Sequence, residues 1–167
     1  MRKVVHFIAL LLFVLLPMQG RERGEPWLDE LDGELAKKGE YDAQKEARIV
    51  QLRGRLRASL DDRDRYNYSR ALYEEYQSYK YDSAYAYARE MARLAAAAEL
   101  PDARVEAGCA TTFCLISAGL YKEAFDVMNA LDVEEVSPAT LLEYYKMQVR
   151  LNYSARGYSQ TAPYWDE

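Results

Sequence analysis

Histidine is almost absent from this chain of 167 residues. The single histidine, His6, lies in an apolar N-terminal stretch that we expect to be removed, which leaves none in the rest of the chain. Without histidine, the Ser-His-Asp and Cys-His arrangements that activate nucleophiles cannot form. The commonest ligand of zinc is missing as well, and two cysteines alone do not make a zinc site. The sequence therefore predicts no metal.

Cysteine and glycine are also scarce. Cys109 and Cys114 lie five positions apart on one predicted helix, about 140° apart around its axis, so we expect no bond between them. They are interpreted as small buried apolar residues. The eight glycines are scattered, and no glycine-rich phosphate-binding loop is present. We therefore predict no cofactor and no enzyme. The many carboxylates are interpreted as surface charge on helices. The alternative is that two of them form an acid–base pair across helices.

Positive charge is in deficit. The formal net charge is −5, and the part after the first 20 residues is more acidic still, because that leader holds Arg2 and Lys3 and no acid. Nucleic-acid binding needs a concentrated positive surface, so no nucleic-acid partner is expected. Half of the chain is apolar, which argues against disorder and fits one domain with a modest core.

Long apolar runs are missing beyond the N-terminus. Arg2 and Lys3 precede an uncharged, mostly apolar run over residues 4–18, which is too short for a membrane span and suits a signal peptide. We interpret residues 1–20 as a signal peptide and expect an exported, periplasmic protein. The longest later uncharged stretch, residues 107–121, contains Thr and Ser and is interpreted as a buried helix, so no membrane span is expected after the leader.

What the chain does contain is helical periodicity throughout. A stripe of leucines predicts a helix over residues 26–38, broken by Gly39, and a second helix is predicted over residues 41–59. We expect residues 21–60 to form an N-terminal helical hairpin. The second helix is locally basic, which indicates either a solvated face or a site for an acidic partner. Alternating strand patterns and hairpin turns are absent.

Tyrosines crowd the next segment. Tyr66, Tyr68, Tyr73, Tyr76 and Tyr79 lie within 14 positions, partly at helical spacing. Exposed tyrosines are enriched at binding surfaces, so these five are the predicted partner-binding residues for a protein or peptide. The alternative interpretation is packing between helices, which the spacing also predicts.

Repeated helix pairs are predicted over residues 61–167. Asp82 is the expected N-cap of a helix whose face holds small residues, and Gly119 is the expected end of the helix before the next turn. A glycine at the turn, an aromatic two residues later and an alanine three after that resemble a tetratricopeptide repeat, whose helix pairs stack because one pair cannot bury its apolar face. The expected packing residues are Ala84, Ala88, Met91, Gly119, Tyr121 and Ala124.

The last predicted helix begins at Ser137 and Pro138. It carries Leu141, Leu142, Tyr145 and Val149, and one side of it has no predicted neighbour. Exposed apolar patches usually mark interfaces, so we expect a homo-oligomer through this C-terminal helix.

A broader resemblance covers nearly the whole chain. It rests on residues 31–35, 41–52, 72–76, 81–84, 119–124, 143–145 and 164–165. Together they resemble the N-terminal region of the Bacteroidota family known as domain of unknown function 6377. The resemblance implies a periplasmic array of tetratricopeptide-like helices, followed in that family by a membrane helix and a cytoplasmic helix-turn-helix segment, neither of which this sequence contains.

Three functional interpretations follow. The first is a non-catalytic binding module, the periplasmic sensing or protein-interaction part of a membrane-anchored regulator. The second is a self-sufficient periplasmic adaptor. The third is a vestigial truncated product without activity of its own. The expected fold is all-α: an N-terminal hairpin followed by degenerate repeats in a right-handed α-solenoid fragment.

Overall fold

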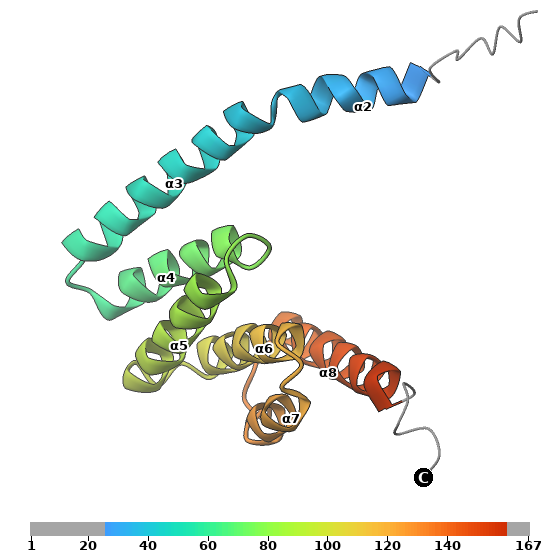
Figure 1. Cartoon of the computed structure of the whole chain (residues 1–167). Helices are drawn as coiled ribbons and strands as arrows, with labels where there is room; N and C mark the ends of the chain where they lie inside the picture. Colours follow the sequence, from blue (N-terminus) through green and yellow to red (C-terminus); the bar gives the residue numbers. More distant parts are fainter. Residues whose placement is uncertain (1–25, 160–167) are drawn as a thin grey trace, which may run out of the picture. The chain divides into compact units, whose positions relative to one another are not determined.

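The computed structural model describes residues 26–159, which form seven helices and no strand (Figure 1). The all-α class predicted from helical periodicity is therefore confirmed. The chain divides into two compact units, and the division falls between Asp42 and Ala43, inside one helix. The predicted signal peptide, residues 1–20, lies outside the described residues.

The first unit contains helix α2 (Pro26–Ala36) and the start of α3 (Lys38–Ala58). The two helices are separated at Lys37, not at Gly39, which the sequence predicted to be the break. Gly39 is helical because the first turn of α3 is held locally: the Tyr41 N–H donates to the Lys37 carbonyl and Lys38 pairs with Asp42. The leucine stripe of α2, Leu28, Leu31 and Leu35, is exposed, so the predicted hairpin stays a prediction.

The second unit contains the rest of α3 and five further helices: α4 (Asp62–Tyr76), α5 (Tyr81–Ala97), α6 (Pro101–Ser117), α7 (Tyr121–Asn129) and α8 (Pro138–Ser159). Within this unit α3 packs through Ile49, which is fully buried. Its basic residues also contact α4, since Arg48 and Lys45 both pair with the Glu75 carboxylate, at 3.0 and 3.6 Å. Part of the basic face of α3 is therefore engaged within the chain.

Helices α4, α5 and α6 share one core. Ala84, Ala88 and Met91 of α5 are buried in it, together with Leu72 of α4. Small side chains on α5 let the neighbouring helices approach closely. The predicted N-cap at Asp82 is wrong, because α5 already begins at Tyr81 and its cap position is Lys80, which has extended backbone.

Helices α6, α7 and α8 share a second core, which includes Ala124 and Met128 of α7. Gly119 has φ +75° between α6 and α7, a left-handed conformation that favours glycine and confirms it as the residue after the helix end. Gly108 lets α6 lie against Leu131, because a Cβ added there would lie 2.5 Å from a Leu131 methyl carbon. Tyr121 is half-buried at the edge of this core.

Helix α8 begins where the sequence predicted, after the Ser137 cap. The Ser137 hydroxyl accepts a bond from the Thr140 N–H at 3.3 Å. Thr140 and Leu151 are buried toward α6 and α7, whereas Leu142 and Val149 lie on the opposite side and are exposed. The open apolar side expected from the sequence is thus present.

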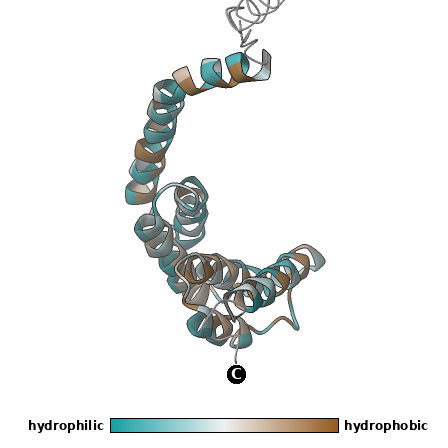
Figure 2. Ribbon diagram, turned by 45° about the vertical axis from the view of Figure 1, so that its right-hand side comes forward, coloured by the Kyte–Doolittle hydropathy of each residue, from teal (hydrophilic) through white to brown (hydrophobic). Residues whose placement is uncertain are grey.

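No helix within residues 26–159 is long and apolar enough to cross a membrane. In Figure 2, where brown marks hydrophobic residues, every coloured helix also contains teal or pale segments.

Candidate functional site

Three cavities lie along one side of α4 and α6. The polar cavity, of about 260 Å³, lies at the start of both helices and is lined by Arg63, Asn67 and Asp102 among others. The acidic cavity, also about 260 Å³, lies halfway along, and the aromatic cavity, about 350 Å³, lies at the helix ends. All three are within the second unit.

The three cavities adjoin one another. Arg70 and Glu106 line both the polar and the acidic cavity, and Gln77 lines both the acidic and the aromatic cavity. Residue numbers rise along α4 and α6 together, so the two helices run in the same direction beside a continuous depression. We call this depression the α4–α6 groove.

The α6 side of the groove follows from its sequence. Glu106, Ala110, Phe113 and Ser117 are spaced by four, three and four residues, which places them on one face of the helix. Helix α8 lies next to this face, since the Arg150 guanidinium sits 4.6 Å from the centre of the Phe113 ring. The groove is therefore built mainly from α4, α6 and α8, and α5 adds residues to two of its cavities.

The acidic cavity is the centre of the groove. Among the described residues that line it are three carboxylates, Glu74 of α4, Glu106 of α6 and Glu143 of α8, and one cation, Arg70. Arg70 is shared, because its guanidinium lies 3.2 Å from Glu74 and 3.6 Å from Glu106. Cys109 also lines this cavity, and burial, followed by the charges of Glu143 and Glu106, raises the pKa of its thiol to about 11. Glu143 pairs with Lys146 of the same helix at 2.7 Å, so Glu74 and Glu106 are the two carboxylates that share a single guanidinium.

Tyr66 fixes the boundary between the polar and acidic cavities. Its hydroxyl lies 3.1 Å from the Ala103 carbonyl and 3.0 Å from a Glu106 carboxylate oxygen, and it donates toward them. Burial and the neighbouring Glu106 charge raise the pKa of Tyr66, so the hydroxyl stays protonated. The bond therefore orients the Glu106 carboxylate at the point that both cavities share.

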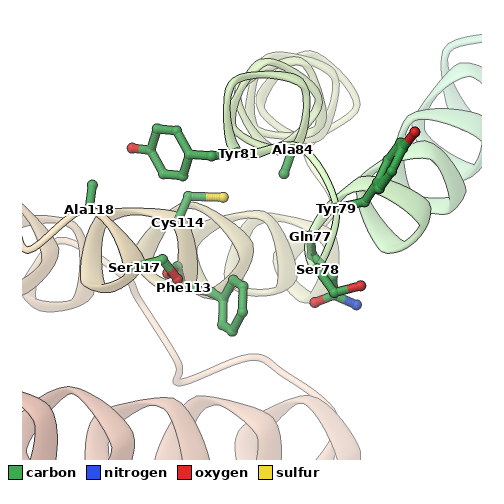
Figure 3. A pocket seen from close by; sticks show the side chains of 9 residues that line it. All are labelled: Gln77, Ser78, Tyr79, Tyr81, Ala84, Phe113, Cys114, Ser117 and Ala118. Atoms are coloured by element: carbon green, nitrogen blue, oxygen red, sulfur yellow. The ribbon is translucent and has the colours of Figure 1, made fainter.

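The aromatic cavity closes the other end (Figure 3). Tyr81 and Ala84 come from α5, Cys114 and Phe113 from α6, and Figure 3 shows the Tyr81 ring and the Cys114 side chain side by side. Tyr79 lies at the rim, where its hydroxyl donates to Glu46 at 2.9 Å. In the part of the chain that the structure describes, no carboxylate or basic group lines this cavity. It suits an apolar group.

The five predicted tyrosines do not form one surface. Tyr66, Tyr73 and Tyr79 line the polar, acidic and aromatic cavities respectively. Tyr76 lies elsewhere, because its ring is buried, stacked 5.7 Å from the Tyr87 ring and covered by Arg53. Tyr68 is half-buried and lines none of the three cavities. Packing therefore accounts for part of the cluster, and the binding role of the rest stays a prediction.

Sequence reasoning missed the other groove residues. Glu106, Phe113, Glu143 and Met147 come from helices that the tyrosine cluster does not include. The recurrence on one face of α6, from Glu106 to Ser117, was available in the sequence. What the sequence does not give is the neighbour of that face, which depends on how successive helix pairs stack.

Reactive groups are few in this part of the chain. Within residues 26–159 no group of three or more His, Cys, Asp or Glu side chains is arranged to hold a metal ion. Cys109 and Cys114 are both free, which confirms that they do not bond to each other. Burial raises the pKa of the Cys114 thiol to about 11. Neither thiol therefore has the low pKa of a nucleophile at neutral pH.

Comparison with known proteins adds one finding. The family model of the SusR N-terminal TPR domain, where TPR stands for tetratricopeptide repeat, matches residues 35–167. No curated protein and no solved structure matches the chain. The match spans most of the chain and includes every helix of the second unit. With its stacked helix pairs and small packing residues, the chain belongs to the SusR N-terminal TPR domain family.

Proposed function

We propose that the protein is a non-catalytic binding module that holds an extended peptide in the α4–α6 groove. The main support for this proposal is that the three cavities are continuous. The polar and acidic cavities share Arg70 and Glu106, and the acidic and aromatic cavities share Gln77. From Arg63 to Gln77 the groove follows α4 for roughly 21 Å at the rise of an α-helix. An extended peptide covers that length with about six residues.

The chemistry of the groove specifies the peptide. Glu74 and Glu106 share one guanidinium in the acidic cavity, and this excess of negative charge favours a basic side chain at the centre of the peptide. The aromatic cavity, with Tyr81 and Phe113, favours an apolar side chain at one end. Helical-repeat proteins commonly use such extended surfaces to bind partners.

A peptide library tests this proposal directly. Phage displaying random peptides of eight residues would be selected on the wild-type protein, and enriched sequences measured by fluorescence polarisation. We expect enrichment of Lys or Arg beside an apolar residue. Gln77→Arg places a bulky cation where the acidic and aromatic cavities meet, so it should weaken the selected peptides at least about tenfold, by steric blockage and charge repulsion.

Gln51→Arg is the matched control, because Gln51 is exposed on α3 and lines none of the three cavities. It should leave peptide affinity unchanged. The proposal fails if no peptide is enriched. It also fails if the selected peptides bind both variants equally, because they then bind outside the groove.

We also propose that the protein is exported and acts as the periplasmic sensing part of a membrane-anchored regulator. The family name refers to the N-terminal domain of SusR, and the leader-like residues 1–20 and the resemblance to family 6377 support this proposal. Mass spectrometry of periplasmic extract should find a chain that starts near Arg21. An intact Met1 on a protein confined to the cytoplasm would contradict it.

Association through α8 belongs to the same proposal. Leu142, Tyr145, Val149 and Tyr153 follow one another at helical spacing and are exposed by 54%, 52%, 70% and 81%. This stripe faces away from the buried side of the helix, so a second copy can cover it without disturbing either core.

A further inference from the structure

A fourth cavity lies away from the groove, among α5, α6 and α7. At about 430 Å³ it is the largest of the five cavities described for residues 26–159, and its volume is in the range of small-molecule sites. On α5 the lining residues form one short stripe, because Tyr85, Arg89 and Ala92 are spaced by four and three residues. We call it the α5–α6–α7 cleft.

The cleft and the groove use opposite faces of α6. Arg104, Gly108 and Thr111 line the cleft, spaced by four and three residues, whereas Glu106 and Phe113 line the groove. At 100° per residue the two sets lie about half a turn apart around the helix axis. Binding in the cleft is therefore independent of the function proposed for the groove.

The floor of the cleft is apolar and closely packed. Gly108 has no side chain, and Leu131 fills the space that a Cβ would take, with methyl carbons 2.5 and 2.7 Å from that position. Val127 and Ala130 continue the floor on the α7 side. A ligand that lies here meets hydrocarbon, so its body must be apolar.

The charge of the cleft has one sign. Arg89 and Arg104 line it, and no carboxylate among residues 26–159 does, in a chain whose formal net charge is −5. Among the described residues Arg89 has no ion pair, and Arg104 has only a 3.4 Å bond from its guanidinium to the Ala96 carbonyl. Two guanidinium groups beside an apolar floor match an anion joined to a hydrocarbon, and guanidinium pairs well with carboxylate.

We propose that the α5–α6–α7 cleft binds a small amphiphilic carboxylate. Its hydrocarbon part lies over Gly108 and Leu131, and its carboxylate accepts hydrogen bonds from Arg89 and Arg104. The apolar floor supplies most of the contact area, and the two arginines select the anion over a neutral molecule of the same shape.

Octanoate and 1-octanol test the proposal, because they share a hydrocarbon chain and differ in the charged group. Both would be titrated into the ¹⁵N-labelled full chain and followed by amide chemical shifts. Octanoate should shift the amides around Gly108 and Thr111, with an affinity at least about tenfold higher than that of octanol. Added salt should weaken octanoate and leave octanol unchanged.

Variants separate the two parts of the site. Arg89→Gln with Arg104→Gln should reduce octanoate affinity to that of octanol. Arg55→Gln with Arg57→Gln removes the same charge from exposed positions of α3, and should change nothing. Ala92→Phe fills the cleft from an exposed position and should abolish binding of both compounds while the circular dichroism spectrum stays helical.

Three results would overturn the proposal: no shift of the cleft amides at millimolar octanoate, equal affinity for octanoate and octanol, or an equal loss in the α3 control. A failure of peptide selection on the groove would leave this experiment unaffected, because the groove residues play no part in it.

Discussion

The Asp102 carboxylate accepts two hydrogen bonds from Ser137, one from the backbone N–H at 2.9 Å and one from the hydroxyl at 2.8 Å. Asp102 lies in the first turn of α6, and Ser137 caps α8, so one carboxylate joins the starts of two helices that are 35 residues apart in sequence. Together these helices form one wall of the acidic cavity.

Asp102→Asn should therefore lower the melting temperature at neutral pH. The bonds from Thr140 and Ser137 hold the pKa of Asp102 below its ordinary value of 3.8. The folded state thus favours the charged form, and its contribution is present above pH 3.8 and lost as the pH falls through the lower folded pKa. Thermal unfolding followed by circular dichroism should show a wild-type advantage that shrinks in strong acid.

Asp82→Asn is the control for that experiment, because Asp82 also lies in the first turn of a helix but carries no such bond to another helix. An equal loss in the two variants would assign the effect to the helix dipole instead of the Ser137 contact.

Arginine at the repeat positions should be strongly destabilising. Ala84 and Ala124 are buried at helix contacts, so Ala84→Arg or Ala124→Arg should cost about 3 kcal/mol or more through overpacking and a buried charge. Ala86→Arg, at an exposed position of the same α5, should stay within about 0.5 kcal/mol of wild type. Urea unfolding measures all three, and similar midpoints for Ala84→Arg and Ala86→Arg would refute the repeat register.

Gly108→Ala should destabilise the protein although alanine favours helix. The added Cβ would meet the Leu131 side chain at 2.5 Å, and the cost of overpacking should exceed the gain in helix propensity, leaving a net loss of about 1 kcal/mol. Gly54→Ala meets nothing within 4 Å and should stabilise by up to about 1 kcal/mol. The Gly108→Ala/Leu131→Ala double variant should recover part of the difference between them in a double-mutant cycle.

The two thiols should make the fold sensitive to alkali. Their pKa values are raised from 9.0 to about 11, so the stabilisation of the neutral thiols is complete below pH 9 and is lost as the pH rises through about 11. Both thiols should react slowly with a thiol reagent at pH 8. Cys109→Ala with Cys114→Ala should flatten the stability profile between pH 9 and 11, while the buried Tyr66 still contributes a loss of its own at higher pH.

Association through α8 should depend on the exposed stripe. Tyr145→Glu with Val149→Glu should reduce any oligomer measured by light scattering over a wide concentration range, because charge would enter the apolar contact. Ala86→Glu adds the same kind of charge at an exposed position of α5 and should have no effect. A wild-type chain that stays monomeric at every concentration would remove this proposal.

Helix positions and their packing faces could be predicted from local sequence. Gly119 lies at a turn with a left-handed backbone, and the small residues Ala84 and Ala124 lie where helices make close contact. The ends of helices were predicted less well, as at Gly39 and Asp82, because contacts with neighbouring residues also decide where a helix begins. Helix α5, for example, begins at Tyr81, one residue before the expected cap Asp82, and the Tyr81 ring stacks on the Tyr85 ring at 6.1 Å.

The groove could not be predicted in the same way. Its central pair, Arg70 and Glu106, is separated by 36 positions and meets only when α4 and α6 lie side by side. The tyrosine pattern indicated α4 and the turn after it, and it did not distinguish Tyr73, which faces the groove, from Tyr76, which faces α3.

The extensive helix contacts of the second unit all join helices that are one or two apart along the chain: α6, for example, contacts α5, α7 and α8. Folding such a chain requires no closure of long loops, so the entropic barrier to assembly is low. Structure can begin around α6 and spread toward both ends, one helix at a time. Each helix can therefore form its stable contacts as soon as the next one or two helices along the chain are present.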